Sequence, residues 1–174
     1  MSRSTVRPTN VERYFSEDDV IVSKTDPKGI ITYANKIFLT IADYSEEEVL
    51  GKPHNIIRHP DMPAGVFRLM WNRIQSGNEI FAYVCNMAKN GDHYWVLAHV
   101  TPNFDRDRRI VGYHSNRRVP DKHILPVIKD LYAQMRAEER RHASSKEGAA
   151  ASVGIINAML DRKGLTYDEY IHGL

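Results

Sequence analysis

The stretch RHPDMP, residues 58 to 63, brings together three side chains that are capable of chemistry. Arg58, His59 and Asp61 lie within four residues around a proline, directly ahead of an apolar segment with helical spacing. A permanent cation, a titratable imidazole and a carboxylate are compatible with a catalytic site, a metal site or a ligand clamp. The surrounding sequence decides between these three possibilities.

A metal or catalytic site would need further ligands at suitable spacings. The chain contains no H-E-x-x-H motif and no readable cluster of carboxylates that could complete such a site. We therefore do not expect an enzyme. Asp61, taken alone, is explained as the N-cap of the following helix, whereas consecutive Arg58 and His59 beside a proline offer no packing advantage. This contrast favours the ligand clamp.

Composition excludes several classes of protein. The 174 residues are 42% apolar, which suits one core with helical extensions. The sequence contains 24 basic and 22 acidic side chains, and the basic residues are scattered along it. No nucleic-acid partner is therefore expected. The single cysteine, Cys85, excludes an internal disulfide and a cysteine-based zinc cluster. No apolar run is long enough for a membrane span, and we expect a cytoplasmic protein.

Alternation and turn residues predict an α+β domain with a five-stranded antiparallel sheet and short helices on one face. The helix that carries the clamp is expected to begin near Asp61, and an S-x-x-E capping box at Ser45 and Glu48 marks an earlier one. The strands are predicted at 20–24, 30–34, 79–87, 93–102 and 109–118.

One face of the fourth predicted strand is too apolar for solvent. His93, Trp95, Leu97 and His99 share that face by alternation. We expect the N-terminal cap, a C-terminal helix or a second protomer to cover it.

Four regions follow from these patterns. They are an N-terminal cap at 1–18, the domain at 19–119, an amphipathic helix at 120–142, and a small-residue linker with a helical tail at 143–174, in which 143–154 is either a linker or a weakly packed helix. The apolar stripe of the third region suits either a dimer seam or packing on the sheet. In the tail, Thr166 and Glu169 form a second capping box.

Residues 20 to 118 resemble a PAS domain, specifically the flavin-binding PAS sensor of bacterial aerotaxis receptors. The shared segments are ITYAN at 31–35, GKPHNIIRHPDMP at 51–63, MW at 70–71 and KNGDHYWV at 89–96. The resemblance implies a PAS fold that holds FAD without a covalent bond, senses redox state or oxygen through the flavin and passes the change to a signalling module.

The resemblance also implies a set of flavin-binding residues. Arg58, His59 and Asp61 match the family positions that matter most for flavin binding. A guanidinium suits the pyrophosphate, and the N-terminus of the helix near Asp61 favours an anion. Three further side chains are expected to contact the flavin ring or the adenine: Trp71, Asn35 and Asn86.

Output is expected to pass through a homodimer or a separate signalling protein such as a chemoreceptor or kinase. Two alternatives remain open. One is a haem-binding sensor with His54 or His59 as axial ligand. The other is a ligand-free dimerisation module, because Ile80-Phe81-Ala82 and residues 85–88 depart from the family pattern. A cysteinyl-flavin adduct is not expected, since Cys85 lies in a strand away from the clamp.

Overall fold

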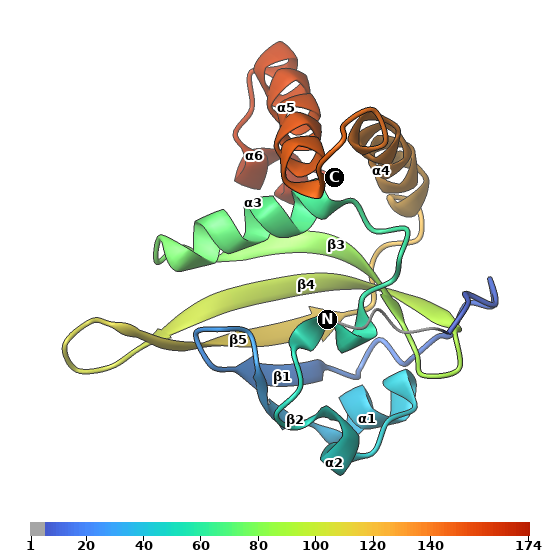
Figure 1. Ribbon diagram of the computed structural model, residues 1–174, viewed down its shortest axis with the longest axis vertical. Coiled ribbons are helices and arrows are strands. Elements are labelled where there is room, and N and C mark those ends of the chain that lie inside the picture. The colour runs from blue at the N-terminus through green and yellow to red at the C-terminus, as the bar shows by residue number, and fades with distance from the viewer. Residues whose placement is uncertain (1–5) are drawn as a thin grey trace.

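The computed structural model describes residues 6–174 and contains the predicted five-stranded antiparallel sheet (Figure 1). The strand order is β2-β1-β5-β4-β3, so the hairpin of the first two strands lies beside the last strand. Residues 1–5 of the expected N-terminal cap lie outside the described part. The strands are β1 Ile21–Thr25, β2 Ile31–Ala34, β3 Ile80–Met87, β4 His93–Phe104 and β5 Ile110–Arg118.

Four short helices connect β2 to β3. Both predicted capping boxes are present: Ser45 and Glu48 begin α2, and Thr166 and Glu169 begin the last helix of the chain. Such reciprocal caps satisfy backbone donors that a short helix cannot pair internally. The connecting helices are α1 Lys36–Ala42, α2 Glu46–Val49, the 3₁₀ helix η1 His54–Ile57 and α3 Ala64–Gln75.

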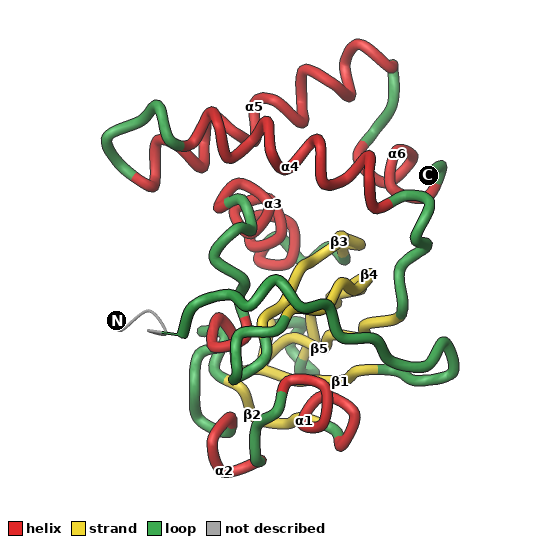
Figure 2. Tube along the Cα trace, turned by 90° about the vertical axis from the view of Figure 1, so that its right-hand side faces the viewer, coloured by secondary structure: helices red, strands yellow, loops and turns green. Residues whose placement is uncertain are grey.

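Three helices follow the sheet and pack on α3 and β3. Helices α4 (Leu125–Glu139) and α5 (Ser145–Lys163) lie against each other and above α3, whereas α6 (Tyr167–His172) contacts β3 (Figure 2). The apolar stripe of α4 points into the protein, where Leu131 and Met135 are buried. Of the two expectations for this stripe, packing within the chain is therefore the one that the fold shows.

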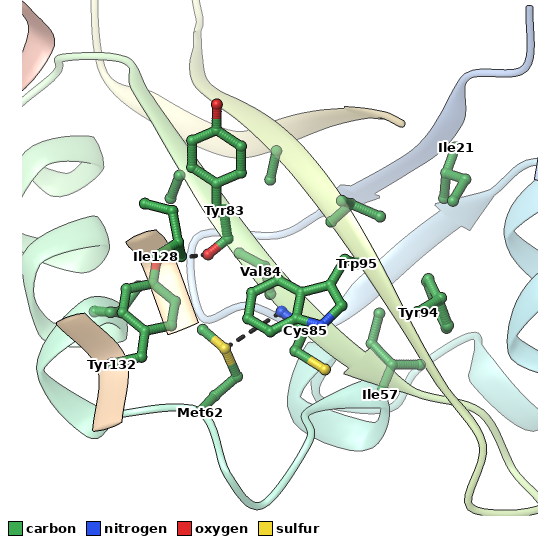
Figure 3. Close-up of a cluster of buried hydrophobic side chains, with 14 of the residues drawn as sticks. Ile21, Ile57, Met62, Tyr83, Val84, Cys85, Tyr94, Trp95, Ile128 and Tyr132 are labelled. Atoms are coloured by element: carbon green, nitrogen blue, oxygen red, sulfur yellow. Dashed lines mark hydrogen bonds between the residues drawn. The ribbon is translucent and has the colours of Figure 1, made fainter. Parts of the chain in front are cut away.

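Helices α4 and α6 close the free edge of β3. The Tyr132 hydroxyl of α4 donates to the Tyr83 carbonyl at 2.6 Å (Figure 3). The Tyr167 hydroxyl of α6 donates to the Phe81 carbonyl at 2.8 Å. The next outward group, the Cys85 amide, donates to the Met62 sulfur. Edge strands carry unpaired backbone groups that invite pairing with other chains, and these contacts satisfy them from within.

The opposite edge of the sheet is also partly paired. In β2, the Ile31 amide donates to the Lys52 carbonyl at 2.9 Å, and the Gly51 amide donates back to the Ile31 carbonyl at 2.9 Å. Both edges of the sheet therefore carry hydrogen bonds to segments of the same chain.

The apolar outer face of β4 is covered by two of the expected elements. Trp95 stacks on Tyr132 of α4 with ring centroids 6.3 Å apart. The N-terminal segment runs beside the start of β4, where the Arg13 amide donates to the His93 carbonyl at 2.7 Å, and Phe15 lines a small pocket together with Trp95. The cover thus comes from both ends of the described chain.

One expectation about helix boundaries is wrong. Helix α3 begins at Ala64 with Pro63 as N-cap, so Asp61 does not cap it. Residues 145–154, for which a linker or a weakly packed helix was expected, form the first half of α5, and small side chains such as Ala149 and Ser152 allow close packing against α3 and α4.

The closure of the β3 edge predicts a measurable contribution of Tyr132. Tyr132→Phe removes the donor and leaves the Tyr83 carbonyl without its partner in a buried position. We expect the free energy of unfolding to fall by about 1–3 kcal/mol, measured by urea titration. Tyr33→Phe is the control, because Tyr33 is 45% exposed and its variant should change stability by less than about 0.5 kcal/mol. Equal stability of the two variants would contradict this role of α4.

Candidate functional site

A cavity of about 350 Å³ lies between the inner face of the sheet and the segment formed by η1 and α3. This volume falls within the range of about 300–1,000 Å³ that is typical of small-molecule sites. Side chains from η1, α3 and the sheet supply the apolar part of the wall: Ile57, Phe67, Met70, Trp71, Ile74, Val84, Ala98 and Val100. The exposed residues Lys28 and Asn55 also line it, so this end of the cavity meets solvent.

Three polar side chains from different elements meet at the inner wall. Arg117 of β5 is 3% exposed, and its Nη2 donates to Ser23 Oγ at 2.8 Å and to His54 Nε2 at 2.6 Å. The hydroxyl of Ser23 lies 2.9 Å from the same imidazole nitrogen. Antiparallel pairing of β1 with β5 places Ser23 opposite Ser115, two residues before Arg117, which brings the two side chains onto one face.

The guanidinium fixes the protonation state of His54. Because Arg117 can only donate, His54 Nε2 must accept, so the imidazole is neutral with its proton on Nδ1. Burial and the positive charge of Arg117 lower the pKa of His54 to about 3. Burial also lowers the pKa of Arg117, to about 10, and the guanidinium stays charged at neutral pH.

No carboxylate balances this charge at the cavity. Among the described residues that line it, none is aspartate or glutamate, whereas Lys28, Arg58 and Arg117 are basic. A buried cation without an anionic partner is costly unless something else stabilises it. The cavity therefore suits a ligand that offers negative charge or strong hydrogen-bond acceptors.

Unpaired donors on the wall also indicate a ligand with hydrogen-bond acceptors. Four buried side-chain polar atoms in the described chain have no hydrogen-bond partner, and three of them belong to residues that line the cavity. They are Arg117 Nη1, Ser115 Oγ and Asn86 Nδ2. Buried polar groups in native proteins are nearly always bonded, so three such atoms around one cavity indicate where a ligand would complete them. Carbonyl oxygens and ring nitrogens along the edge of a flat heterocycle fit this requirement.

Three of the six predicted flavin-binding residues line the cavity. Arg58 and Asn86 come from neighbouring segments that an isolated antiparallel bridge joins, and the Arg58 guanidinium also lies 4.2 Å over the ring of Phe67. The third, Trp71, packs edge-on against Tyr113 with ring centroids 5.5 Å apart.

The other three lie outside the cavity wall. His59 accepts from the Asp61 amide through Nδ1 at 3.1 Å, and Asp61 forms an ion pair with Arg136 of α4 at 2.5 Å. Asn35 caps α1 and its amide is bonded to three backbone groups, of which the Phe38 amide is one. The RHPDMP stretch is thus divided: Arg58 lines the cavity, and Asp61 contacts α4.

The expected anion site at the start of α3 also differs in the structure. The amides of Ala64 and Gly65 donate to the carboxylate of Glu139, which comes from α4. A carboxylate of the same chain therefore occupies the position that the sequence assigned to the ligand's phosphate.

Sequence reasoning did not identify the polar wall of β5. The signal was nevertheless present in GYHSNRR at 112–118, because strict alternation puts Tyr113, Ser115 and Arg117 on one face of the strand. Polar residues at buried alternate positions are unusual and mark a site. His54 was considered only as a haem ligand.

Comparisons with known proteins agree with this architecture. The model of the PAS fold matches residues 31–117. The chain is 38% identical over 122 residues to the aerotaxis receptor of Escherichia coli K12, a match that covers 70% of this chain and 24% of the receptor. The chain therefore spans about a quarter of the length of that relative.

Two solved structures show the same fold. A light-oxygen-voltage domain studied with a flavin analogue aligns with a TM-score of 0.56 and 20% identity, over 66% of this chain and 87% of that one. The dark structure of the Aureochrome1 LOV photoreceptor aligns with a TM-score of 0.56 and 24% identity, over 66% and 86%. Among residues 6–174, no helix combines the length and apolar character that crossing a membrane requires. Since the PAS model covers half of the sequence and the strand order, sheet and helices agree with it, the chain belongs to the PAS family.

Proposed function

We propose that this PAS domain binds a flavin, FAD, without a covalent bond and reports redox state or oxygen level to a signalling partner. The observation that carries the proposal is the set of three unpaired donors at one cavity, Asn86 Nδ2, Ser115 Oγ and Arg117 Nη1. The similarity to the aerotaxis receptor supports the same assignment. A sensory rather than enzymatic role accords with both.

The walls of the cavity suit the two parts of an isoalloxazine ring. Its flat faces would contact apolar and aromatic side chains, whereas its oxygen and nitrogen edge would accept from the polar wall. A bound flavin supplies reversible electron uptake, which changes the charge and hydrogen bonding of the ring. Arg117 would stabilise added negative charge, because no carboxylate of the lining residues competes for it. Lys28 at the solvent end is suited to the phosphates that follow the ring.

The predicted residues outside the wall would act indirectly. We propose that His59 and Asp61 hold the loop that presents Arg58, His59 through its bond to the Asp61 amide and Asp61 through Arg136. Asn35 would hold β1 against the start of α1. Their importance for flavin binding stays a prediction.

Other ligand chemistries fit less well. A haem iron would need the lone pair of an unprotonated imidazole nitrogen. In His54 the lone pair of Nε2 accepts from Arg117, and in His59 the lone pair of Nδ1 accepts from a backbone amide, so the other nitrogen of each neutral ring carries the proton. Burial raises the pKa of the Cys85 thiol to about 12, and Cys85 does not line the cavity. A cysteinyl-flavin adduct therefore lacks a nucleophile, since the thiolate is the reactive form.

The signalling partner is proposed on similar grounds. A chemoreceptor or kinase that contacts the C-terminal helices, or a second copy of this chain, would receive the change. Because the stripe with Leu131 is buried, a homodimer would have to use other surfaces than the predicted seam. A cytoplasmic location stays a prediction.

Arg117→Met tests the flavin assignment because it should lower flavin affinity without lowering the stability of the flavin-free protein. Methionine keeps most of the side-chain volume but removes the buried charge, and Ser23 can then donate to His54. The flavin-free protein should be as stable as the wild type or more stable, because an unbalanced buried cation is lost. Flavin affinity, titrated by absorbance with added FAD, should fall at least about tenfold, since hydrogen bonds to a charged donor contribute about 1.5–3 kcal/mol.

Arg118→Met is the matched control, because Arg118 is the next residue and is exposed. Its flavin affinity should stay within about twofold of the wild type, a change below 0.5 kcal/mol. Loss of flavin in both variants, or in neither, would argue against the proposed role of Arg117.

The neutral state of His54 predicts a dependence of stability on pH in the flavin-free protein. The folded pKa of about 3 lies below the ordinary value of 6.5, so the unfolded chain takes up a proton that the folded protein does not. Stability is therefore full above the ordinary value and falls as the pH drops below it, by about 1.4 kcal/mol per unit.

Urea titrations at pH 7.5 and 5.0 measure this dependence. The wild type should lose about 2 kcal/mol more than His54→Gln between the two values, because glutamine still accepts from Arg117 but does not titrate. His123→Gln, at an exposed position, should behave as the wild type. An equal loss in wild type and His54→Gln would show that His54 is protonated in the folded state.

A further inference from the structure

Helix α3 belongs both to the cavity and to the C-terminal helices. One face of it contributes Phe67, Met70, Trp71 and Ile74 to the cavity wall. Its other side packs against α5 and α4 (Figure 2). A shift of α3 in response to a ligand would therefore change its contacts with the C-terminal helices.

The N-terminus of α3 is held by a residue of α4. Its N-cap, Pro63, has no side-chain acceptor. Instead, the Ala64 amide donates to Glu139 Oε2 at 3.0 Å and the Gly65 amide donates to Glu139 Oε1 at 2.9 Å. A carboxylate at this position pairs two otherwise unpaired amides and interacts favourably with the helix dipole.

Helix α5 completes this contact. The hydroxyl of Ser152, which is fully buried, donates to Glu139 Oε1 at 2.7 Å. A Cβ atom on Gly65 would lie 2.1 Å from the same hydroxyl oxygen, so only glycine permits this approach. The carboxylate of Glu139 thus accepts from α3 and α5 at once, and these three helices meet at one point.

A second contact joins α4 to the loop before α3. Arg136 lies one turn before Glu139 and forms an ion pair with Asp61. The side chain of Arg136 is 34% exposed and that of Asp61 is 57% exposed. Exposed ion pairs contribute little, so Glu139, which accepts three hydrogen bonds, is the stronger connection.

We propose that Glu139 is a positioning residue that couples occupancy of the cavity to the packing of α4 and α5. The inference rests on the proposed function in that it needs a ligand in the cavity. A ligand that holds α3 in place strengthens the contact with Glu139, and by reciprocity the contact with Glu139 increases the affinity for the ligand. The C-terminal helices therefore respond to the state of the cavity through the start of α3.

Hydrogen exchange measured with and without FAD tests the coupling. In the wild type, FAD should slow exchange of the amides at 64–66 and in α5 by about tenfold, which corresponds to one charge-assisted hydrogen bond. Glu139→Gln places an amide NH₂ among three donors, so at least one of the three bonds is lost. In this variant the FAD-dependent protection of α5 should disappear, and FAD should dissociate about tenfold faster.

Two further variants separate coupling from plain stability. Glu138→Gln alters the neighbouring residue, which pairs with Arg141 and His142 and not with α3, and it should keep the wild-type response. Gly65→Ala places a methyl group of α3 against Ser152 of α5 and forces the two helices apart. It should abolish the FAD-dependent protection of α5, as Glu139→Gln does.

The possible outcomes distinguish the two proposals. A wild-type protein that takes up no FAD overturns the proposed function, and the coupling with it. A wild-type protein that binds FAD, combined with a Glu139→Gln variant that melts earlier but keeps the FAD-dependent protection of α5 and the wild-type dissociation rate, overturns the role of Glu139 alone.

Discussion

The guanidinium of Arg117 imposes the constraint on which the site depends. A permanent charge stands inside an apolar cavity with no carboxylate among the residues around it. Hydrogen bonds to Ser23 and His54 offset only part of the desolvation cost, and they require three separate segments to meet: β1, η1 and β5. Under the proposed function, an electron-rich ligand would offset the remaining cost, because its acceptor atoms would pair with the guanidinium.

The same constraint explains why the imidazole beside Arg117 is neutral. A second positive charge at His54 would double the imbalance, so the fold uses this side chain as an acceptor. Added negative charge on a ligand would therefore be balanced by Arg117, while His54 would stay neutral. On the opposite wall, α3 is fixed at its first turn by Glu139 and faces the cavity with its later turns. Under the two proposals, the polar wall would hold the ligand and α3 would transmit the state of the ligand to the C-terminal helices.

Sequence patterns predicted the strands and helix starts more reliably than the residues of the cavity. Strand alternation and the capping boxes at Ser45 and Thr166 depend on neighbours in sequence, and the structure confirms them. The N-cap role of Asp61 was assigned wrongly because its partner, Arg136, lies far along the chain and no local signal reveals it. Asn86 and Trp71 were assigned from the chemistry that a flavin ring requires, and both line the cavity. Arg117 was missed although alternation in β5 was readable, because its partners come from β1 and η1.

Helix α5 shows a related limit of sequence reasoning. Its run of small residues was compatible with a linker or with a weakly packed helix, because small side chains offer little apolar surface to bury. In the structure, the absence of bulk at Gly148 and Ala149 is what lets the helix approach its neighbours. A small-residue stretch is interpretable only when the surface that it contacts is known.

The hydrogen bonds along both edges of the sheet have a consequence for how this protein recognises others. Tyr132 and Tyr167 occupy carbonyls of β3, and residues 51 and 52 occupy the amide and carbonyl of Ile31. A foreign strand could extend the sheet only after these bonds break. Recognition is thereby directed to side-chain surfaces, whose affinity can be altered residue by residue while the backbone that forms the floor of the cavity stays the same. New partners can therefore be acquired during evolution without rebuilding the ligand site.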